Sequence, residues 1–152
     1  MRKGTLIGVI TSLLGVLALF LNLVSFKVGE ISDVGNTALT VQNLSVYSCL
    51  QNTLIGYEAQ EAFQTIFNSF LILSISIALF SLLSNKKNFI GIITLILSCI
   101  HLTASIVLFN LGPQALKNID NINNVSFGVG LYLLILSGIL GVVASILSIF
   151  KK

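Results

Sequence analysis

The chain has very little charge and few of the residues that usually carry catalysis. Only 9% of its 152 residues are charged, and it contains a single histidine, a single proline, two cysteines and no tryptophan. A soluble domain of this length carries far more charge to stay in solution. The sequence has no Gly-rich phosphate loop, nucleophile elbow, HExxH or CxxC motif. We therefore expect a protein that is not an enzyme and that uses no cofactor or metal.

Long apolar segments take up most of the chain, which is 55% hydrophobic. A membrane-spanning helix needs about 20 apolar residues. We expect one domain, residues 1–152, with spans at about 4–26, 62–83, 89–111 and 125–150, the third ending at Gly112-Pro113. Outer loops 27–61 and 112–124 and a cytoplasmic turn at 84–88 would join these spans. The first apolar run is too long for a signal peptide and is expected to stay as a helix.

The basic residues are distributed unevenly between the connections. Six of the eight lie before the first span, in the second connection or after the last span: Arg2, Lys3, Lys86, Lys87, Lys151 and Lys152. The other two lysines and all five acids lie in the remaining connections. Because Lys and Arg in short loops stay in the cytoplasm, this bias predicts a multi-pass protein of the plasma membrane with both termini cytoplasmic. Lipid headgroups account for the basic charge, so no nucleic-acid partner is expected.

Small and polar residues recur along three of the spans at alternating spacings of three and four. This set of seam residues consists of Gly4, Gly8, Thr11, Gly15, Ala18, Asn22, Gly91, Thr94, Ser98, His101, Ser105, Ser137, Gly141, Ala144 and Ser148. In the second span only Ser74, Ala78 and Ser81 fit the pattern. A 3.5-residue period is typical of left-handed helix pairs, and small residues let membrane helices approach closely. The predicted fold is an all-α membrane protein, a left-handed four-transmembrane-helix bundle.

His101 is the only histidine and lies near the middle of the third span. An ionisable side chain at that depth is a candidate for a proton relay or for a ligand of a cofactor or metal. The competing interpretation is a neutral imidazole that forms a hydrogen bond with a serine on its own or a neighbouring helix. No intramembrane acid or second histidine accompanies it, which favours the second interpretation.

The first outer loop contains further signals. Residues 37–47 partly alternate between apolar and polar side chains, which predicts a small β element such as a hairpin. Asn43 begins an Asn-Leu-Ser acceptor pattern for glycosylation on the predicted outer side. Cys49 lies in this loop and Cys99 in the third span, so a bond between them is not expected; Cys49 is either a free thiol or a partner between chains.

The layout resembles the claudin and peripheral-myelin-protein-like tetraspan family. The segment from Leu44 to Cys49 occupies the place of that family's first-loop signature, and Ala59 to Phe63 resembles its helical approach to the second span. The signature tryptophan and the second loop cysteine are absent. The resemblance implies lateral assembly and contacts on the outer face.

These observations predict a non-catalytic structural or accessory subunit that packs within a larger membrane complex or with copies of itself. Its partners would be the lipid bilayer and other membrane subunits. Two alternatives stay open: a claudin-like adhesion or assembly protein that acts through loop 27–61, and a channel, carrier or redox subunit that uses His101.

Overall fold

The computed structural model describes residues 3–31, 37–45, 47, 57–84, 88–117 and 122–150. The described chain is mostly helical and carries a small sheet. Its helices are α1 (Lys3–Phe20), α3 (Tyr57–Leu83), α4 (Asn88–Lys117) and α5 (Val129–Phe150). Its strands are β1 (Val24–Ile31), β2 (Thr37–Leu44) and β3 (Ile122–Phe127).

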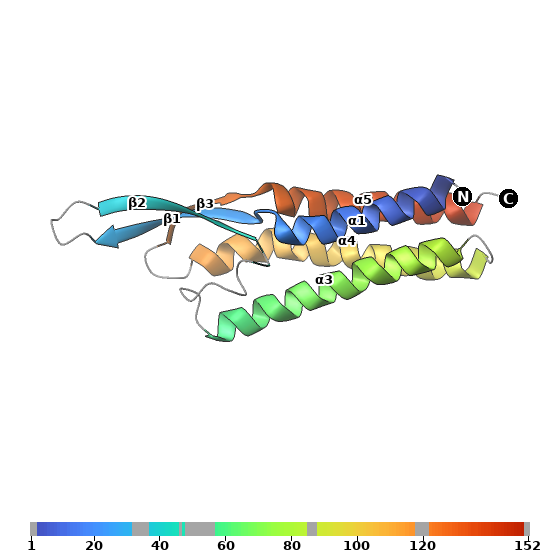
Figure 1. The fold of residues 1–152 in the computed structure, drawn as a ribbon, viewed down its shortest axis with the longest axis horizontal. Helices are drawn as coiled ribbons and strands as arrows, with labels where there is room; N and C mark the ends of the chain where they lie inside the picture. Colours follow the sequence, from blue (N-terminus) through green and yellow to red (C-terminus); the bar gives the residue numbers. More distant parts are fainter. Residues whose placement is uncertain are drawn as a thin grey trace.

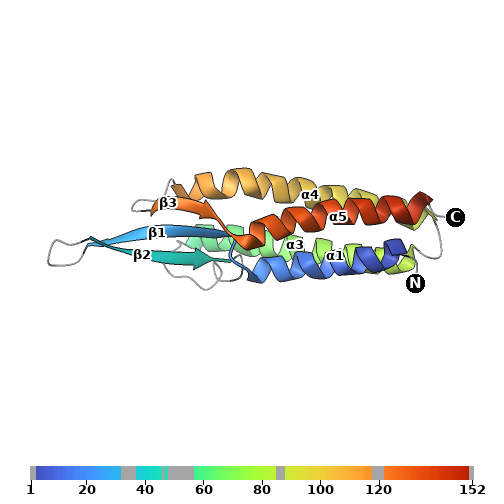
Figure 2. The ribbon, with the colours of Figure 1, turned by 90° about the horizontal axis from the view of Figure 1, so that it is seen from above.

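The four helices form an elongated bundle in which neighbours run in opposite directions (Figures 1 and 2). Each helix lies beside two others in the order α1, α3, α4, α5, and α1 packs most extensively on α5. The start of α1, the end of α3, the start of α4 and the end of α5 gather at one end of the bundle (Figure 1). The sheet extends from the opposite end.

The sheet has the strand order β2-β1-β3, and both pairings are antiparallel. β1 and β2 pair from Val24 opposite Leu44 to Ile31 opposite Thr37. On the other side of β1, Val24 lies opposite Phe127. The β element expected in the first outer loop is therefore confirmed, and a strand of the second outer loop joins it.

The first and fourth apolar segments change from helix to strand earlier than expected. α1 ends at Phe20 instead of continuing to residue 26, and residues 24–26 belong to β1. α5 begins at Val129 instead of 125, and residues 125–127 belong to β3. Both segments read Val-Ser-Phe, and this apolar–polar alternation suits a strand with two unlike faces.

The end of the third segment also differs from the expectation. Gly112-Pro113 was expected to end the helix, but α4 continues through this pair to Lys117. A proline inside a helix removes one backbone hydrogen bond, here the bond to the carbonyl of Phe109. The next turn of α4 forms in spite of that loss.

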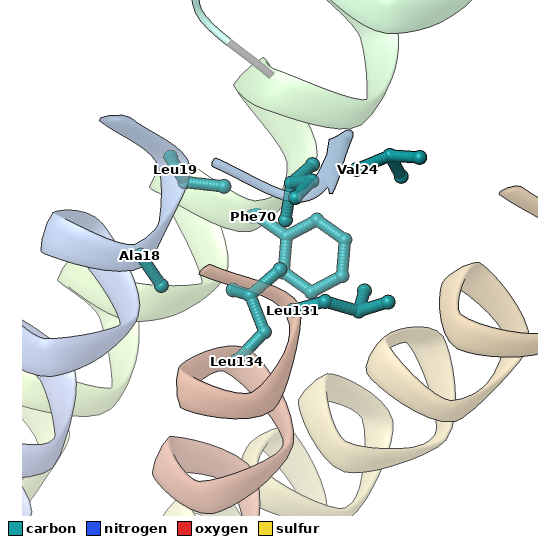
Figure 3. Packing of buried hydrophobic residues seen from close by; sticks show 7 residues of the cluster. Ala18, Leu19, Val24, Phe70, Leu131 and Leu134 are labelled. Atoms are coloured by element: carbon teal, nitrogen blue, oxygen red, sulfur yellow. The ribbon is translucent and has the colours of Figure 1, made fainter. Parts of the chain in front are cut away.

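A compact apolar core lies where the bundle meets the sheet (Figure 3). Its buried members are Ala18, Leu19, Leu23, Val24, Phe70, Leu131 and Leu134. They come from α1, the α1–β1 connection, β1, α3 and α5, and the Phe70 ring lies across the start of α5 (Figure 3). This core fixes the sheet on the end of the bundle.

Three of the helices are long and apolar enough to cross a membrane by length and composition. These segments are Gln64–Leu83, Phe89–Leu111 and Val129–Phe150. α1 contains a shorter apolar stretch, Gly4–Ala18.

Candidate functional site: the polar interior of the bundle

The side chains of this bundle are distributed in the reverse of a soluble protein. The described interior is rich in hydroxyl groups, whereas large apolar side chains point outward from all four helices. On α1, for example, Thr11 is 2% exposed and Leu13 is 65% exposed. The same contrast holds on α4 between Ser98, which is fully buried, and Ile96. Such apolar outer faces are compatible with contact with a lipid bilayer.

The structure places almost all of the predicted seam residues inside the bundle. Fourteen of the fifteen are buried, and Asn22 is the exception. Asn22 was expected to lie within the first span, but it follows the end of α1 and its side chain is exposed. Its carbonyl accepts a hydrogen bond of 2.7 Å from the Gly130 amide, so its backbone joins the two strand–helix connections.

Gly4 and Gly8 of the seam face small residues on neighbouring helices. At Gly4 an added Cβ would lie 3.0 Å from the Ala144 carbonyl oxygen, so α1 and α5 meet backbone to backbone. At Gly8 an added Cβ would overlap the Ser81 hydroxyl of α3. Close approach of this kind maximises van der Waals contact, which drives helix association where lipid removes the hydrophobic difference.

Most buried hydroxyl groups are satisfied within their own helix. Ser105, Ser137, Ser145 and Ser148 each donate to a carbonyl three or four residues earlier over 2.8 Å. Some hydroxyl contacts also cross from α4 to α5: Ser98 Oγ lies 3.4 Å from Ser145 Oγ, and the Ser105 hydroxyl reaches the Leu134 carbonyl over 3.4 Å. These intrahelical bonds lower the cost of burying the hydroxyl groups.

His101 lies in the middle of this interior and is 2% exposed. Its Nε2 atom is 3.0 Å from the Ser137 Oγ atom on α5. Its ring and the ring of Phe70 from α3 make a T-shaped contact with centroids 5.2 Å apart. The interpretation of His101 as an imidazole bonded to a serine of a neighbouring helix thus has a defined geometry. Within the described residues no three His, Cys, Asp or Glu side chains gather to hold a metal ion.

Two clusters of aromatic rings lie where the bundle meets the sheet. Phe20, Tyr47 and Phe67 lie with centroids 5.2 to 6.2 Å apart. On the other side, Phe109 stacks on Phe127 at 4.3 Å, and Tyr132 packs against both rings. Sequence reasoning missed both clusters and the role of Phe70, because each ring comes from a different segment and no local pattern brings them together.

The remaining predicted positions are Asn43 and the two cysteines. Asn43 belongs to β2 and lies opposite Ser25 of β1. Its glycosylation stays a prediction. Cys99 is an exposed free thiol on α4, and Cys49 lies outside the described residues.

The fold defines a class: an antiparallel helical bundle with an apolar exterior, a hydroxyl-rich interior and a three-stranded sheet at one end. No protein-family model matches the chain, and a search of curated proteins also finds no match. The functional argument therefore rests on the residues and their geometry.

Proposed function

We propose that this chain is an integral membrane protein that crosses the bilayer four times and serves as a non-catalytic structural or accessory subunit. The observation that carries the proposal is the reversed distribution of side chains. Leu13, Ile72, Phe89 and Val129, one from each helix, are all more than 60% exposed. An assembly of this kind is stable where lipid or another membrane protein covers these faces.

α1 supplies the fourth crossing in this proposal, although its apolar stretch is shorter than the other three. Its 18 residues span about 27 Å at the helical rise, close to the roughly 30 Å of a bilayer core. α1 also packs on α5 more extensively than any other pair of helices. The aromatic clusters support a membrane boundary at the sheet end, because aromatic side chains collect at membrane–water interfaces.

The orientation follows from the charges. All six basic residues outside the outer loops are adjacent in sequence to the helix ends that gather opposite the sheet. We propose that this end faces the cytoplasm of the plasma membrane and that the sheet lies outside. A membrane-impermeant maleimide should then label Cys49 on intact cells in a Cys99→Ser background. It should label Lys151→Cys, in a background without Cys49 and Cys99, only after the cells are opened. The reverse pattern would refute this orientation.

The subunit role rests on the closed interior and on the apolar outer faces. Small residues and back-bonded hydroxyls fill the described seam, and the 3.5-residue spacing favours a left-handed bundle. The spans in α3 and α4 are less buried than the span in α5, at 22% each against 39%, so their outer faces offer more surface for contact. We propose that other membrane subunits, or copies of this chain, pack against them.

The deciding experiment is a gentle native extraction from the source membrane, followed by mass determination of the intact particle. A particle heavier than one chain with its lipid, either with stoichiometric partners or with several copies, supports the subunit role. A particle of one chain with lipid alone would refute it.

A second candidate function acts through the sheet. Residues 27–31 and 37–44 of loop 27–61 belong to the antiparallel strands β1 and β2, which extend beyond the bundle together with β3, and β2 lies at the edge of the sheet. This arrangement, with the claudin-like layout, favours adhesion or assembly through the outer face. Deleting residues 37–44 removes β2 and keeps the β1–β3 pairing, so it should abolish assembly while the helices still form. Unchanged assembly of that variant would eliminate this candidate.

A further inference from the structure

Two polar atoms in the centre of the bundle have no hydrogen-bond partner within the described part of the chain: Ser74 Oγ and His101 Nδ1. Both residues are almost fully enclosed, with Ser74 1% and His101 2% exposed. Buried polar groups in native proteins are nearly always paired, with protein or with ordered water. An unpaired donor and an unpaired acceptor in one enclosed region therefore require an explanation.

The hydrogen bonds around His101 favour one of the two neutral forms of its ring. Ser137 has one hydroxyl proton and donates it to the Leu134 carbonyl over 2.8 Å. The Ser137 oxygen must then accept from His101 Nε2, which lies 3.0 Å away. We assign the neutral ring with its proton on Nε2, so Nδ1 presents a bare lone pair.

The Ser74 hydroxyl is an exception among the buried hydroxyls of the bundle. Thr94, Ser105 and Ser145, for example, each donate to the carbonyl four residues earlier over 2.8 to 2.9 Å. The Ser74 hydroxyl makes no such bond. It is directed instead toward Gly15 of α1, where an added Cβ would lie 2.9 Å from Ser74 Oγ.

Gly15 brings the unpaired groups to one place. The same Cβ position lies 3.4 Å from His101 Cε1 and 3.4 Å from Ser137 Oγ. Because Cε1 lies between the two ring nitrogens, the Nδ1 edge of the ring also lies near Gly15. Groups from α3, α4 and α5 thus surround a position on α1 that has no side chain.

We propose that this place is a binding site for one water molecule, which accepts a hydrogen bond from Ser74 Oγ and donates one to His101 Nδ1. The guest must both accept and donate, and a site enclosed on four sides by helices takes nothing much larger than water. A continuous chain of hydrogen bonds then runs from Ser74 on α3 through the water and His101 on α4 to Ser137 on α5. It ties α3 to α5, which otherwise make few direct contacts.

The test is nuclear magnetic resonance of the full-length chain in lipid nanodiscs, with histidine labelled by nitrogen-15. The wild type should show a pyrrole-type Nε2, a hydrogen-bonded pyridine-type Nδ1 and a magnetisation-transfer signal from water to the imidazole. Gly15→Ala fills the space and Ser74→Ala removes one partner. Each should shift Nδ1 toward the position of an unbonded nitrogen and remove the water signal.

Ser148→Ala is the matched control, because its hydroxyl donates to Ser145 of its own helix and lies away from His101. It should leave the His101 resonances and the water signal unchanged. The wild-type spectrum alone decides the proposal if a variant fails to fold. An imidazole without any water signal would overturn it, whether Nδ1 proved bare or bonded directly to Ser74.

Discussion

Replacing Gly138 with alanine should push α4 and α5 apart. The added Cβ would lie 2.8 Å from the Leu102 Cα atom, which is backbone and cannot rotate away. Carbon atoms in good contact are separated by about 3.5 to 4.0 Å, so the helices must separate locally by roughly 1 Å. Overpacking of this kind costs about 1 to 3 kcal/mol. Ser137 directly precedes Gly138 in α5. The 3.0 Å contact between Ser137 Oγ and His101 Nε2 should therefore lengthen as well.

Gly141→Ala on the same helix is the matched control. There the nearest atom to the added Cβ is the Ser98 hydroxyl oxygen at 3.1 Å, on a side chain that can adjust. Both substitutions replace glycine by alanine in the interior of one helix, so the gain in helix propensity of about 1 kcal/mol cancels between them. The two variants should differ by about 1 to 3 kcal/mol, with Gly138→Ala the less stable.

The assay is reversible unfolding of each variant by a denaturing detergent in mixed micelles, with helix content as the signal. The nitrogen-15 resonance of His101 Nε2 provides a local reading, which should change in Gly138→Ala and stay fixed in Gly141→Ala. Equal free energies of unfolding for the two variants would refute the claim that backbone contact, rather than helix propensity, governs this interface.

Three further substitutions test other parts of the molecule. Leu13→Arg places a charge on the outer face of α1 and should disfavour membrane insertion of that helix by about 3 kcal/mol. The measurement is the fraction of α1 inserted, compared with Leu13→Ala. Equal insertion of the two variants would argue against a fourth crossing. Phe109→Ala removes the 4.3 Å stacking on Phe127 and should lower the free energy of unfolding by at least about 1 kcal/mol, with a change in the near-ultraviolet circular dichroism. Gly8→Ile would overlap Ser81 and should cost about 1 to 3 kcal/mol in the same unfolding assay, whereas no loss would show that α1 and α3 are packed loosely.

The sequence predicts much of the helical bundle because the apolar composition and the regular spacing of small and polar residues indicate the same helices. The spacing of Gly91, Thr94, Ser98, His101 and Ser105 marks one face of α4, and all five residues are buried. Close approach in a membrane needs small side chains on a single face, so this periodic signal survives in the amino-acid order.

The helix-to-strand boundaries could not be found from hydrophobicity alone. Val24-Ser25-Phe26 continues the apolar run of α1, and Val125-Ser126-Phe127 precedes the apolar run of α5. What makes both segments strands is their pairing: Ser25 lies opposite Ser126, and the Ser126 hydroxyl donates to the Ser25 carbonyl over 3.2 Å. That partner lies 101 residues away, so only the folded chain brings it into position.

Gly128 and Gly130 connect the segment between β3 and α5 to the segment between α1 and β1. Their amides donate to the carbonyls of Leu23 and Asn22 over 2.7 Å each. A Cβ on Gly130 would lie 2.6 Å from the Leu21 carbonyl oxygen. The segment that follows α1 and the segment that precedes α5 are therefore in direct backbone contact. The closest helix pair of the bundle therefore continues directly into the β1–β3 pairing. Because one pair of chain segments forms both, a change in the distance between α1 and α5 must also alter the base of the sheet.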